Sequence, residues 1–524
     1  MNDTTSAPHS GARHTFAKSG IYLTVFVTGA AVMVIELLGT RMIAPFYGAS
    51  LYVWSSLISV TMIALALGYF TGGRWADRAT RTGLSLVISL AALLTLVIPW
   101  ATRPVLLATD PLGLRAGAFV SALVLFSPSL TFLGMVGPFA IKLATSRLDG
   151  IGSSAGSIYA VSTLGSVIGT LVLGFFLFPL VGSRETLIGL GLVLFALGGV
   201  IALYERRLSD RTIAALPSLL LAVLGLMLLP AVVGAGHAYS GAGKFAIRSE
   251  QESLYGWVRV IDEPARNLRM LTSDASVIGA ASISKGTNAL TYQDIVELIP
   301  AISPHIRRAL LIGQGAGHMA MGLRDKYRIV TDTIEIDPAV DDAARQFFGF
   351  TPTGTAVVGD ARYEIRRLTG PYDLIILDCF TGGSEPSHLL TQETLTQLRG
   401  MLAKDGIVAL NFVGYADGGQ NPALASVAQT IGRVFPSQSV FVAEPGDDFG
   451  DYIFLASEKP LNVATPSLTP QQSDWLRARL VSVDRSRGVV LSDNLNPLEH
   501  LQTRKAEHYR HMIVEWLGTD LLVR

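Results

Sequence analysis

Seven runs of apolar residues, each about as long as a membrane span, lie within the first 240 residues of this 524-residue chain. A helix that crosses the hydrocarbon core of a bilayer needs roughly 20 mostly apolar residues. The runs cover about 20–38, 52–73, 84–101, 116–136, 156–181, 186–204 and 213–235. Residues 19–236 are therefore predicted to form an α-helical multi-span membrane domain, preceded by a polar tail at 1–18.

Charge is distributed unevenly along the chain. Only 16% of the residues are charged, against about 25% in an ordinary soluble domain. Residues 1–240 hold 14 Lys and Arg and 8 Asp and Glu, whereas the rest of the chain holds 27 and 33. This division indicates a membrane part, with the lipid bilayer as a partner, followed by a soluble part. Neither part has the basic excess typical of nucleic-acid binding, so no nucleic acid is expected as a partner.

Two further features limit the chemistry. The single cysteine, Cys379, excludes an intrachain disulfide and a cysteine-based metal cage, and no metal is expected. Gly165 and Gly169 have the GxxxG spacing that lets helices approach closely in lipid. Helix packing is the preferred interpretation of this spacing, and the sequence leaves open whether copies of the chain form a homo-oligomer.

The hydrophobic pattern changes after residue 240, where short segments replace the long apolar runs. Residues 237–300 are predicted to form a small β-domain with one helix that ends at Pro300. Residues 301–524 then alternate between strands and helices, which is typical of a mostly parallel, doubly wound, Rossmann-like α/β sheet. The predicted strands are 254–262, 267–272, 276–283, 308–312, 330–336, 355–358, 372–378 and 406–413. The predicted helices are 290–299, 317–325, 338–347, 391–402 and 421–434.

A glycine-rich turn follows the first strand of the alternating series. Such a turn between a strand and a helix lets backbone amides approach a ligand. Its predicted ligand-binding residues are Gly313, Gln314, Gly315 and Gly317. The next three strands end in acids, which are Glu335 and Asp337, then Asp360, then Asp378. Because ligands of such sheets bind at the carboxyl ends of the strands, the set predicts a site for an adenosine-type small molecule.

The glycine turn would suit either a nicotinamide dinucleotide or an S-adenosyl ligand. A dinucleotide fingerprint has a third glycine three residues after the second, and His318 occupies that place. The acid-rich strand ends favour adenosine linked to a cationic sulfonium, as in S-adenosylmethionine.

Residues about 250–460 resemble the polyamine aminopropyltransferases, the spermidine synthase family. The resemblance lies in Tyr292-Gln293-Asp294, the glycine turn, Glu335-Ile-Asp337, Gly359-Asp360 and Asp378. It implies an S-adenosylmethionine-methyltransferase-type fold for 301–524 and S-adenosylmethionine, or its decarboxylated form, as a substrate. It also implies that Asp378 is catalytic and that Glu335 binds the ribose. The other implied cofactor-binding residues are Asp337, Asp360 and Ala361, and the implied substrate-binding residues are Tyr292, Gln293, His318 and Thr381.

The rest of the chain extends this resemblance. The first 240 residues resemble the membrane region of multi-span proteins fused to a spermidine synthase-like domain, on the stretches 36–45 and 159–169. Residues 491–499 are similar to the closing segment of the family. The resemblance therefore covers nearly the whole chain.

Two positions depart from the family's pattern. The family's glycine loop contains an aspartate that reads the donor's amine, where this chain has Ala316, and the second acid of its Asp-x-x-Asp motif is replaced by Thr381. A carboxylate about 4 Å from an ammonium contributes roughly 4 kcal/mol at an effective dielectric near 20. The two losses predict weak or absent spermidine synthesis. They favour intact S-adenosylmethionine, or its thioether products, over the decarboxylated form.

The basic residues favour one orientation in the membrane. Lys and Arg are concentrated in the N-terminal tail and in every second loop, so the positive-inside rule places the N-terminus in the cytoplasm. Seven crossings would then place the soluble half outside, although its nucleotide-like ligand is a cytosolic metabolite. A broken or re-entrant segment within 116–147, which contains Gly134, Gly137 and Pro138, would make the number of crossings even. We expect a multi-pass protein of the cell (inner) membrane with a cytoplasmic soluble half.

Several function classes remain open. The first is an integral membrane enzyme that acts at the γ-carbon side of S-adenosylmethionine or a derivative and releases methylthioadenosine. It would do so by aminopropyltransferase-like transfer or by lyase-type cleavage to homoserine lactone. The alternatives are a polyamine aminopropyltransferase proper, a nucleoside-binding transporter or sensor without turnover, and a methyltransferase. Residues 373–386 show no aromatic-proline motif of methyl transfer.

Overall fold

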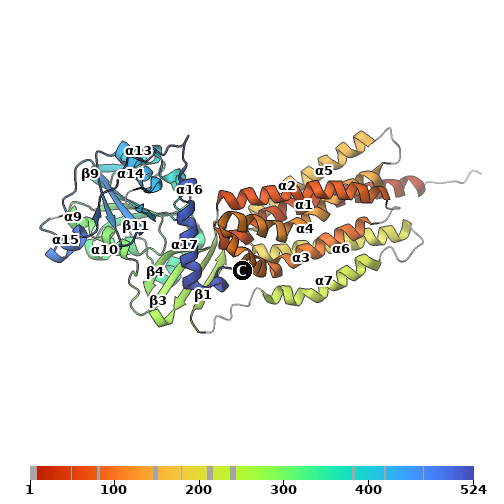
Figure 1. Ribbon diagram of the computed structural model, residues 1–524, viewed down its shortest axis with the longest axis horizontal. Helices are drawn as coiled ribbons and strands as arrows, with labels where there is room; N and C mark the ends of the chain where they lie inside the picture. Colours follow the sequence, from red (N-terminus) through yellow and green to blue (C-terminus); the bar gives the residue numbers. More distant parts are fainter. Residues whose placement is uncertain are drawn as a thin grey trace, which may run out of the picture. The chain divides into compact units, whose positions relative to one another are not determined.

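The computed structural model of the chain divides into two compact units (Figure 1). The helical unit comprises Met1–Ser240 together with Thr519–Arg524, and the sheet unit comprises Gly241–Gly518. The described residues are 9–48, 50–78, 83–145, 151–178, 180–208, 216–235, 243–380, 384–417, 420–463 and 465–523.

Long helices make up the described part of the helical unit. They are α1 (His9–Tyr47), α2 (Leu51–Arg78), α3 (Leu84–Thr109), α4 (Gly113–Ala144), α5 (Ile151–Val172), α6 (Ser183–Leu208) and α7 (Leu216–Ala235). Each of the seven apolar runs overlaps one of these helices, and the fifth run continues past α5 into the π-helical turn Leu173–Leu177. By length and hydropathy, six stretches of the described chain could cross a membrane. One of them, Leu84–Ala144, contains both α3 and α4, which pack side by side.

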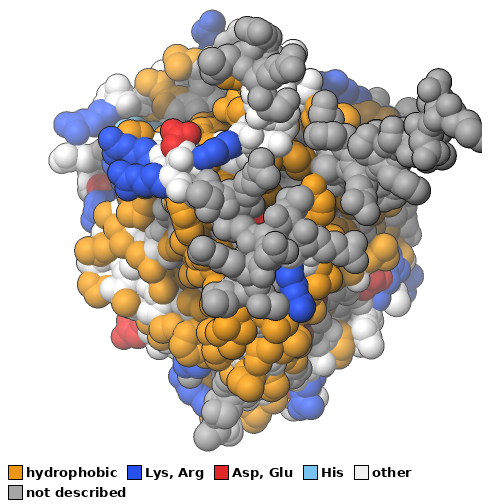
Figure 2. All heavy atoms as spheres, turned by 90° about the vertical axis from the view of Figure 1, so that its right-hand side faces the viewer, with side chains coloured by type: hydrophobic (Ala, Val, Ile, Leu, Met, Phe, Trp, Pro, Cys, Tyr) orange, Lys and Arg blue, Asp and Glu red, His pale blue; other side chains and the backbone are white. Residues whose placement is uncertain are grey.

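Many large apolar side chains of the helical unit face outward. Phe175 and Met227 are 72% and 73% exposed, and Figure 2 shows hydrophobic side chains over large parts of the described surface on its side of the molecule. Exposed apolar surface on this scale marks contact with lipid or with another protein. Helices long enough to span, with outward apolar faces, are what a membrane domain requires.

Glycines allow close helix packing inside this unit. A Cβ placed on Gly165 would collide with the backbone of Phe26 in α1, and one on Gly169 would collide with Ala30. The GxxxG spacing in α5 therefore serves a helix–helix contact. The break expected within 116–147 is not present in α4, which runs as one helix from Gly113 to Ala144 through Pro138.

The sheet unit begins with a small antiparallel sheet. Its strands pair in the order β1 (Ala246–Glu252), β2 (Trp257–Glu263), β3 (Leu268–Ser273) and β4 (Ser276–Ser282), followed by α8 (Thr291–Glu297) and α9 (Ile299–Ile302). The sequence predicted β2 to β4 and the helix. It missed β1, whose residues 248–252 are all charged or polar and lack the apolar alternation of a half-buried strand.

The main sheet has the order β12-β10-β11-β9-β8-β5-β6-β7 within the described residues. Its strands are β5 (Arg308–Ile312), β6 (Val330–Glu335), β7 (Ala356–Val358), β8 (Tyr372–Leu377), β9 (Leu402–Tyr415), β10 (Ser437–Val442), β11 (Phe449–Ser457) and β12 (Leu480–Val481). Strands β5 to β9 are parallel, and β10 to β12 are antiparallel. The fold is thus a Rossmann-like α/β sheet. Within this main sheet, the strands that the sequence predicted are those of the parallel half, β5 to β9.

Helices accompany this sheet. They are α10 (His318–Tyr327), α11 (Pro338–Phe348), α12 (Ala361–Glu364), α13 (Gln392–Gly400), α14 (Pro422–Val434), α15 (Pro470–Arg477), α16 (Leu498–Leu501) and α17 (Thr503–Leu517). Apolar residues of the central strands supply a core on both faces. Leu310 and Ile375 belong to one buried cluster, and their neighbours Leu311 and Ile376 belong to the other. Strands buried on both faces read as continuous apolar runs, which is why the sequence predicted them.

A buried ion pair attaches α17 to the main sheet. The carboxylate of Glu385 accepts hydrogen bonds from the Lys505 ammonium, from Nε2 of Gln502 at 2.6 Å and from the backbone N of Val413 at 2.7 Å. Glu385 and Lys505 are 4% and 3% exposed. Because both groups are removed from water, the charge of each one is compensated by the opposite charge of its partner.

We expect Glu385→Gln to loosen α17. Removing one partner of a buried ion pair typically costs about 3–5 kcal/mol because the other charge stays buried and unpaired. Hydrogen–deuterium exchange of α17 amides, in the full chain in detergent, should therefore accelerate by about a hundredfold or more. The control is Lys459→Met, which removes a pair with Asp405 whose side chains are 73% and 40% exposed. Unchanged α17 exchange in the Glu385 variant would show that the pair does not anchor the helix.

Candidate functional site

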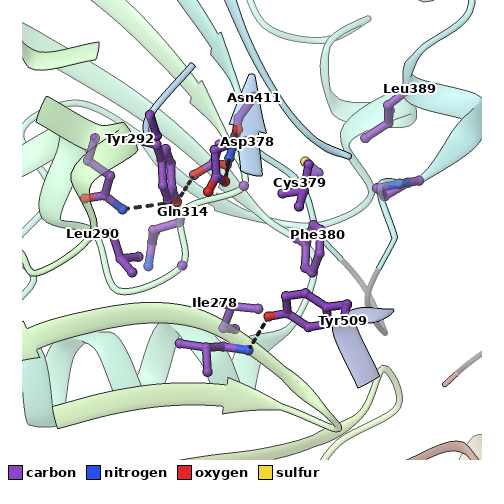
Figure 3. A pocket seen from close by; sticks show the side chains of 18 of the residues that line it. Ile278, Leu290, Tyr292, Gln314, Asp378, Cys379, Phe380, Leu389, Asn411 and Tyr509 are labelled. Atoms are coloured by element: carbon purple, nitrogen blue, oxygen red, sulfur yellow. Dashed lines mark hydrogen bonds between the residues drawn. The ribbon is translucent and has the colours of Figure 1, made fainter. Parts of the chain in front are cut away.

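A cavity of about 530 Å³ lies within the sheet unit at the carboxyl ends of its parallel strands. Figure 3 shows the glycine turn and Asp378 on one side of it and Ile278 of β4 and Tyr509 of α17 on the other. Four parts of the chain that are far apart in the sequence therefore enclose one space. This is the edge at which a doubly wound sheet binds ligands.

The glycine turn reaches the cavity with its backbone. Gly313 and Gly315 line the cavity and have φ angles of 88° and 52°, in the left-handed region that favours glycine. A Cβ on Gly313 would also collide with the carbonyl oxygen of Asp378. Gln314 lines the cavity too, but its amide is engaged by Asp341 at 2.9 Å and Thr333 at 3.0 Å.

Glu335 ends β6 beside this turn. Its carboxylate accepts hydrogen bonds from the backbone N of Gly315 at 3.2 Å and of Asp337 at 3.1 Å. Burial raises the pKa of Glu335 to about 7, although these backbone hydrogen bonds lower it. Asp360 and Ala361 also line the cavity, and the Asp360 side chain caps α12 by accepting from the backbone N of Tyr363 at 3.0 Å.

Three predicted residues lie outside the described lining, and the first is Gly317, which precedes α10 with a φ angle of 80°. Asp337 caps α11 and accepts hydrogen bonds from Ala339 N at 2.9 Å and from Ser253 Oγ at 2.6 Å. Both oxygens of this carboxylate therefore already accept hydrogen bonds within the protein. His318 opens α10 behind the glycine turn, with Nε2 at 3.2 Å from the carbonyl oxygen of Gly286. Burial lowers the pKa of His318, which favours the neutral imidazole.

The structure describes one of the two positions that depart from the family pattern. Ala316 is buried and packs against Gly279 of β4, outside the cavity lining. Its side chain therefore does not adjoin the cavity as the sequence argument assumed. Thr381 lies outside the described residues.

Asp378 stands directly after β8 with both carboxylate oxygens held. Oδ2 accepts from the Tyr292 hydroxyl at 2.8 Å, and Oδ1 accepts from Asn411 Nδ2 at 2.9 Å (Figure 3). Burial raises the pKa of Asp378, whereas these two hydrogen bonds lower it. Nε2 of Gln293 donates in turn to the Tyr292 hydroxyl at 3.3 Å, so Tyr292 contacts Asp378 directly and Gln293 is linked to it through Tyr292.

Asn411 and Asp451 are site residues that the sequence analysis missed. Asn411 lies in β9, and its Nδ2 is also 3.3 Å from Oδ1 of Asp451 in β11. Burial raises the pKa of Asp451 to about 7. Asn411 was detectable as the one polar residue in the apolar run 407–413, but nothing in the sequence placed Asp451 beside it.

The electrostatics of the cavity are one-sided. The carboxylates that line it are Glu335, Asp360, Asp378, Glu444 and Asp451, and no Lys or Arg lines it within the described residues. Desolvation also raises the pKa of Cys379 well above its usual value, so this thiol stays protonated. The arrangement suits a cationic ligand rather than an anionic one, and no described cluster of His, Cys, Asp or Glu is placed to hold a metal ion.

The far wall of the cavity is mostly apolar. The Tyr509 hydroxyl accepts from the backbone N of Val277 at 3.2 Å, and its ring lies 5.4 Å from that of Phe380. Met512, Ile513 and Trp516 continue this wall along α17. Ligand atoms on this side would contact apolar side chains rather than charged groups.

Comparison with known proteins finds relatives but no matching protein-family model. An N-terminal histidine N-methyltransferase of Emericella nidulans is 30% identical over 275 residues, which is 47% of each chain. A polyamine aminopropyltransferase of Vibrio vulnificus is 32% identical over 179 residues, or 32% of this chain and 60% of that protein. Polyamine aminopropyltransferase 2 of Streptomyces coelicolor is 27% identical over 417 residues, or 74% of this chain and 72% of that protein.

The matches cover different shares of this chain and of its relatives. This chain spans about half the length of the first relative and three fifths of the second. The match to the Streptomyces protein is longer than either unit alone, so it includes part of the helical unit. The chain is therefore a spermidine synthase-like protein whose N-terminal region contains helices long and apolar enough to span a membrane.

Proposed function

We propose that the sheet unit is a transferase that breaks the bond between the sulfur and the γ-carbon of an S-adenosylmethionine-type donor, releasing methylthioadenosine. One observation carries this proposal. A carboxylate, Asp378, is held by Tyr292 and Asn411 in the same cavity as the glycine turn and the ribose-binding candidate Glu335. Donor binding and proton transfer can thus take place in one enclosed space.

The adenosine part of the donor would occupy the end of the cavity formed by β5, β6 and β7. Gly313 and Gly315 of the glycine turn line this end, Glu335 would accept hydrogen bonds from the ribose hydroxyls, and Asp360 would contact the adenine. These assignments are supported by the lining and by the family resemblance. The sulfonium would then lie toward Asp378.

The negative charge of the cavity lining favours a donor without a carboxylate. Intact S-adenosylmethionine would bring a carboxylate into a lining of acids with no described Lys or Arg, whereas the decarboxylated form would not. Of the two substitutions that favoured the intact donor, Ala316 has a side chain that does not line the cavity, and Thr381 lies outside the described residues. We therefore propose the decarboxylated donor first and the intact donor second.

The transfer step is a substitution at carbon. The nitrogen of an acceptor amine contributes its lone pair to the γ-carbon, the carbon–sulfur bond breaks, and its electron pair neutralises the sulfonium. Asp378 takes one proton from the acceptor nitrogen, which is general-base catalysis by a carboxylate next to the reacting atoms. The products are an alkylated amine and uncharged methylthioadenosine.

Two other reactions use the same cavity differently. In lyase-type cleavage the donor's own carboxylate attacks its γ-carbon and leaves homoserine lactone, with no acceptor needed. Methyl transfer to nitrogen, as named for the Emericella relative, would release S-adenosylhomocysteine instead. A transporter or sensor would bind the nucleoside and release no product.

The helical unit would hold this enzyme in the membrane. We propose a cytoplasmic sheet unit in the cell (inner) membrane, because S-adenosyl donors are cytosolic metabolites. With the N-terminus also cytoplasmic, one of the helices α1 to α7 must then not cross. Reporter fusions at the two ends of the full chain test this, and a cytoplasmic N-terminus with an external C-terminus would contradict it.

Product analysis tests the reaction itself. The full chain in detergent is incubated with decarboxylated or intact S-adenosylmethionine, with and without 1,4-diaminobutane, and products are identified by mass spectrometry. We expect methylthioadenosine, formed faster when the amine is present. S-adenosylhomocysteine as the product would establish methyl transfer, and no product from any combination would favour a binding protein.

Removal of the Glu335 carboxylate should weaken binding of the nucleoside. A hydrogen bond to a charged group contributes about 1.5–3 kcal/mol, so Glu335→Ala should lower the affinity for methylthioadenosine about tenfold or more. The raised pKa adds a pH dependence: below about pH 7 the free carboxyl is protonated and loses one acceptor, so wild-type affinity should fall. Titration calorimetry between pH 5.5 and 8, about the range in which such a group titrates, checks both effects. A variant with unchanged affinity would remove Glu335 from the site.

Removal of the Asp378 charge should affect turnover more than binding. Asp378→Asn keeps the shape and can still accept from Tyr292, but it cannot take the proton. General-base catalysis contributes about 10²–10⁴-fold, so kcat should fall by this factor while methylthioadenosine binds normally. The control is Asp373→Asn at the opposite end of β8, where the carboxylate accepts from the backbone N of Arg307 and Arg308. Wild-type kcat in the Asp378 variant would exclude the catalytic role.

A further inference from the structure

Two carboxylates from different strands share one amide in the cavity. Nδ2 of Asn411 is 2.9 Å from Oδ1 of Asp378 and 3.3 Å from Oδ1 of Asp451. Two acids so close to one donor repel each other, and a single neutral amide does not balance their charges. Lys505 attracts Asp451 electrostatically but is itself paired with Glu385, so the two acids remain short of positive charge in the described structure.

Two residues linked to this pair by hydrogen bonds have buried acceptors without described donors. Gln293 lines the cavity, is only 6% exposed, and has no described partner for its Oε1. Its orientation is set by its neighbour: the Tyr292 hydroxyl donates to Asp378, so it must accept from Nε2 of Gln293. Oδ1 of Asn411 is likewise buried without a described partner.

These unsatisfied groups define the ligand that would fit. A buried polar atom left without a partner costs about 1–3 kcal/mol. An ammonium carries one positive charge and three N–H donors and accepts nothing. It would balance the charge of the carboxylate pair and could donate to both carboxylates, whereas a hydroxyl has one donor and no charge.

We propose that Asp451 is the residue that binds the acceptor's ammonium group, which lies between Asp451 and Asp378. The proposal rests on the proposed transfer reaction and names the residue that holds its acceptor amine in the protonated form. It also gives the cavity the second acid that the family has at the position of Thr381. That acid comes here from β11, so weak amine binding no longer follows from the substitution at 381.

The two acids then have different tasks. Asp378 takes one proton from the bound ammonium and frees the nitrogen lone pair, which attacks the γ-carbon as the carbon–sulfur electron pair moves to sulfur. Asp451 keeps its charge and holds the nitrogen, which is again positively charged in the secondary ammonium product. The proton on Asp378 passes to solvent once the products leave.

The test measures amine binding separately from turnover. The full chain in detergent is saturated with methylthioadenosine and titrated with 1,4-diaminobutane, or with 1,4-butanediol as an uncharged ligand of the same length. Loss of a charge-assisted hydrogen bond should weaken diamine binding by Asp451→Asn about 10- to 100-fold, with methylthioadenosine affinity unchanged. The control is Asp447→Asn, an exposed carboxylate on the segment before β11 that does not line this cavity, and it should bind both ligands normally.

The outcomes separate this inference from the proposed function. Equal diamine affinity in wild type and Asp451→Asn, binding of the diol as tight as that of the diamine, or no diamine binding by wild type would each overturn the role of Asp451. Methylthioadenosine release would then still decide the transfer reaction by itself. In turnover assays the Asp451 variant should raise the KM for the amine far more than it lowers kcat, whereas a purely structural role would also weaken nucleoside binding.

Discussion

The pairing of β5 with β8 is the contact on which the site depends. The backbone N of Asp378 donates to the carbonyl oxygen of Ile312 at 2.9 Å, which places the end of β8 against the start of the glycine turn. Only a residue without a side chain fits at Gly313, since a Cβ there would strike the Asp378 carbonyl. Because the strands are parallel, the same register brings Glu335 to this edge. The glycine turn and the Asp378 carboxylate are therefore adjacent as a consequence of strand pairing.

Burial of acids without bases is the second constraint. Desolvation favours the neutral form of a carboxyl group, and it raises the pKa of Glu335, Asp378 and Asp451. Glu385 is instead paired with the buried ammonium of Lys505 in α17. The buried acids are thus of two kinds. Glu385 has a lysine of the same chain as its partner, whereas Glu335, Asp378 and Asp451 line a cavity in which a cationic ligand can bind. A cationic ligand would recover part of the desolvation free energy of this lining.

The parallel half of the sheet was predictable for a physical reason. Its strands are buried on both faces and read as apolar runs between turn residues, so β5 to β8 appear within one or two residues of their predicted bounds. The antiparallel β10 to β12 were missed because polar residues such as Gln438 and Asp451 interrupt their apolar pattern. The helix α17 was also missed, although Tyr509, Met512, Ile513 and Trp516 have helical spacing and line one cavity.

The sequence by itself determined the membrane-length helices, the glycine turn and the acids at the strand ends, because each depends on residues that are near one another in the chain. Only the tertiary structure decided which acids face the cavity. Glu335 and Asp337 are two residues apart, yet one lines the cavity and the other caps α11. Asn411 and Asp451 meet because β9 and β11 pair across 40 residues of sequence. Such contacts follow from the packing of distant strands, which local residue patterns do not encode.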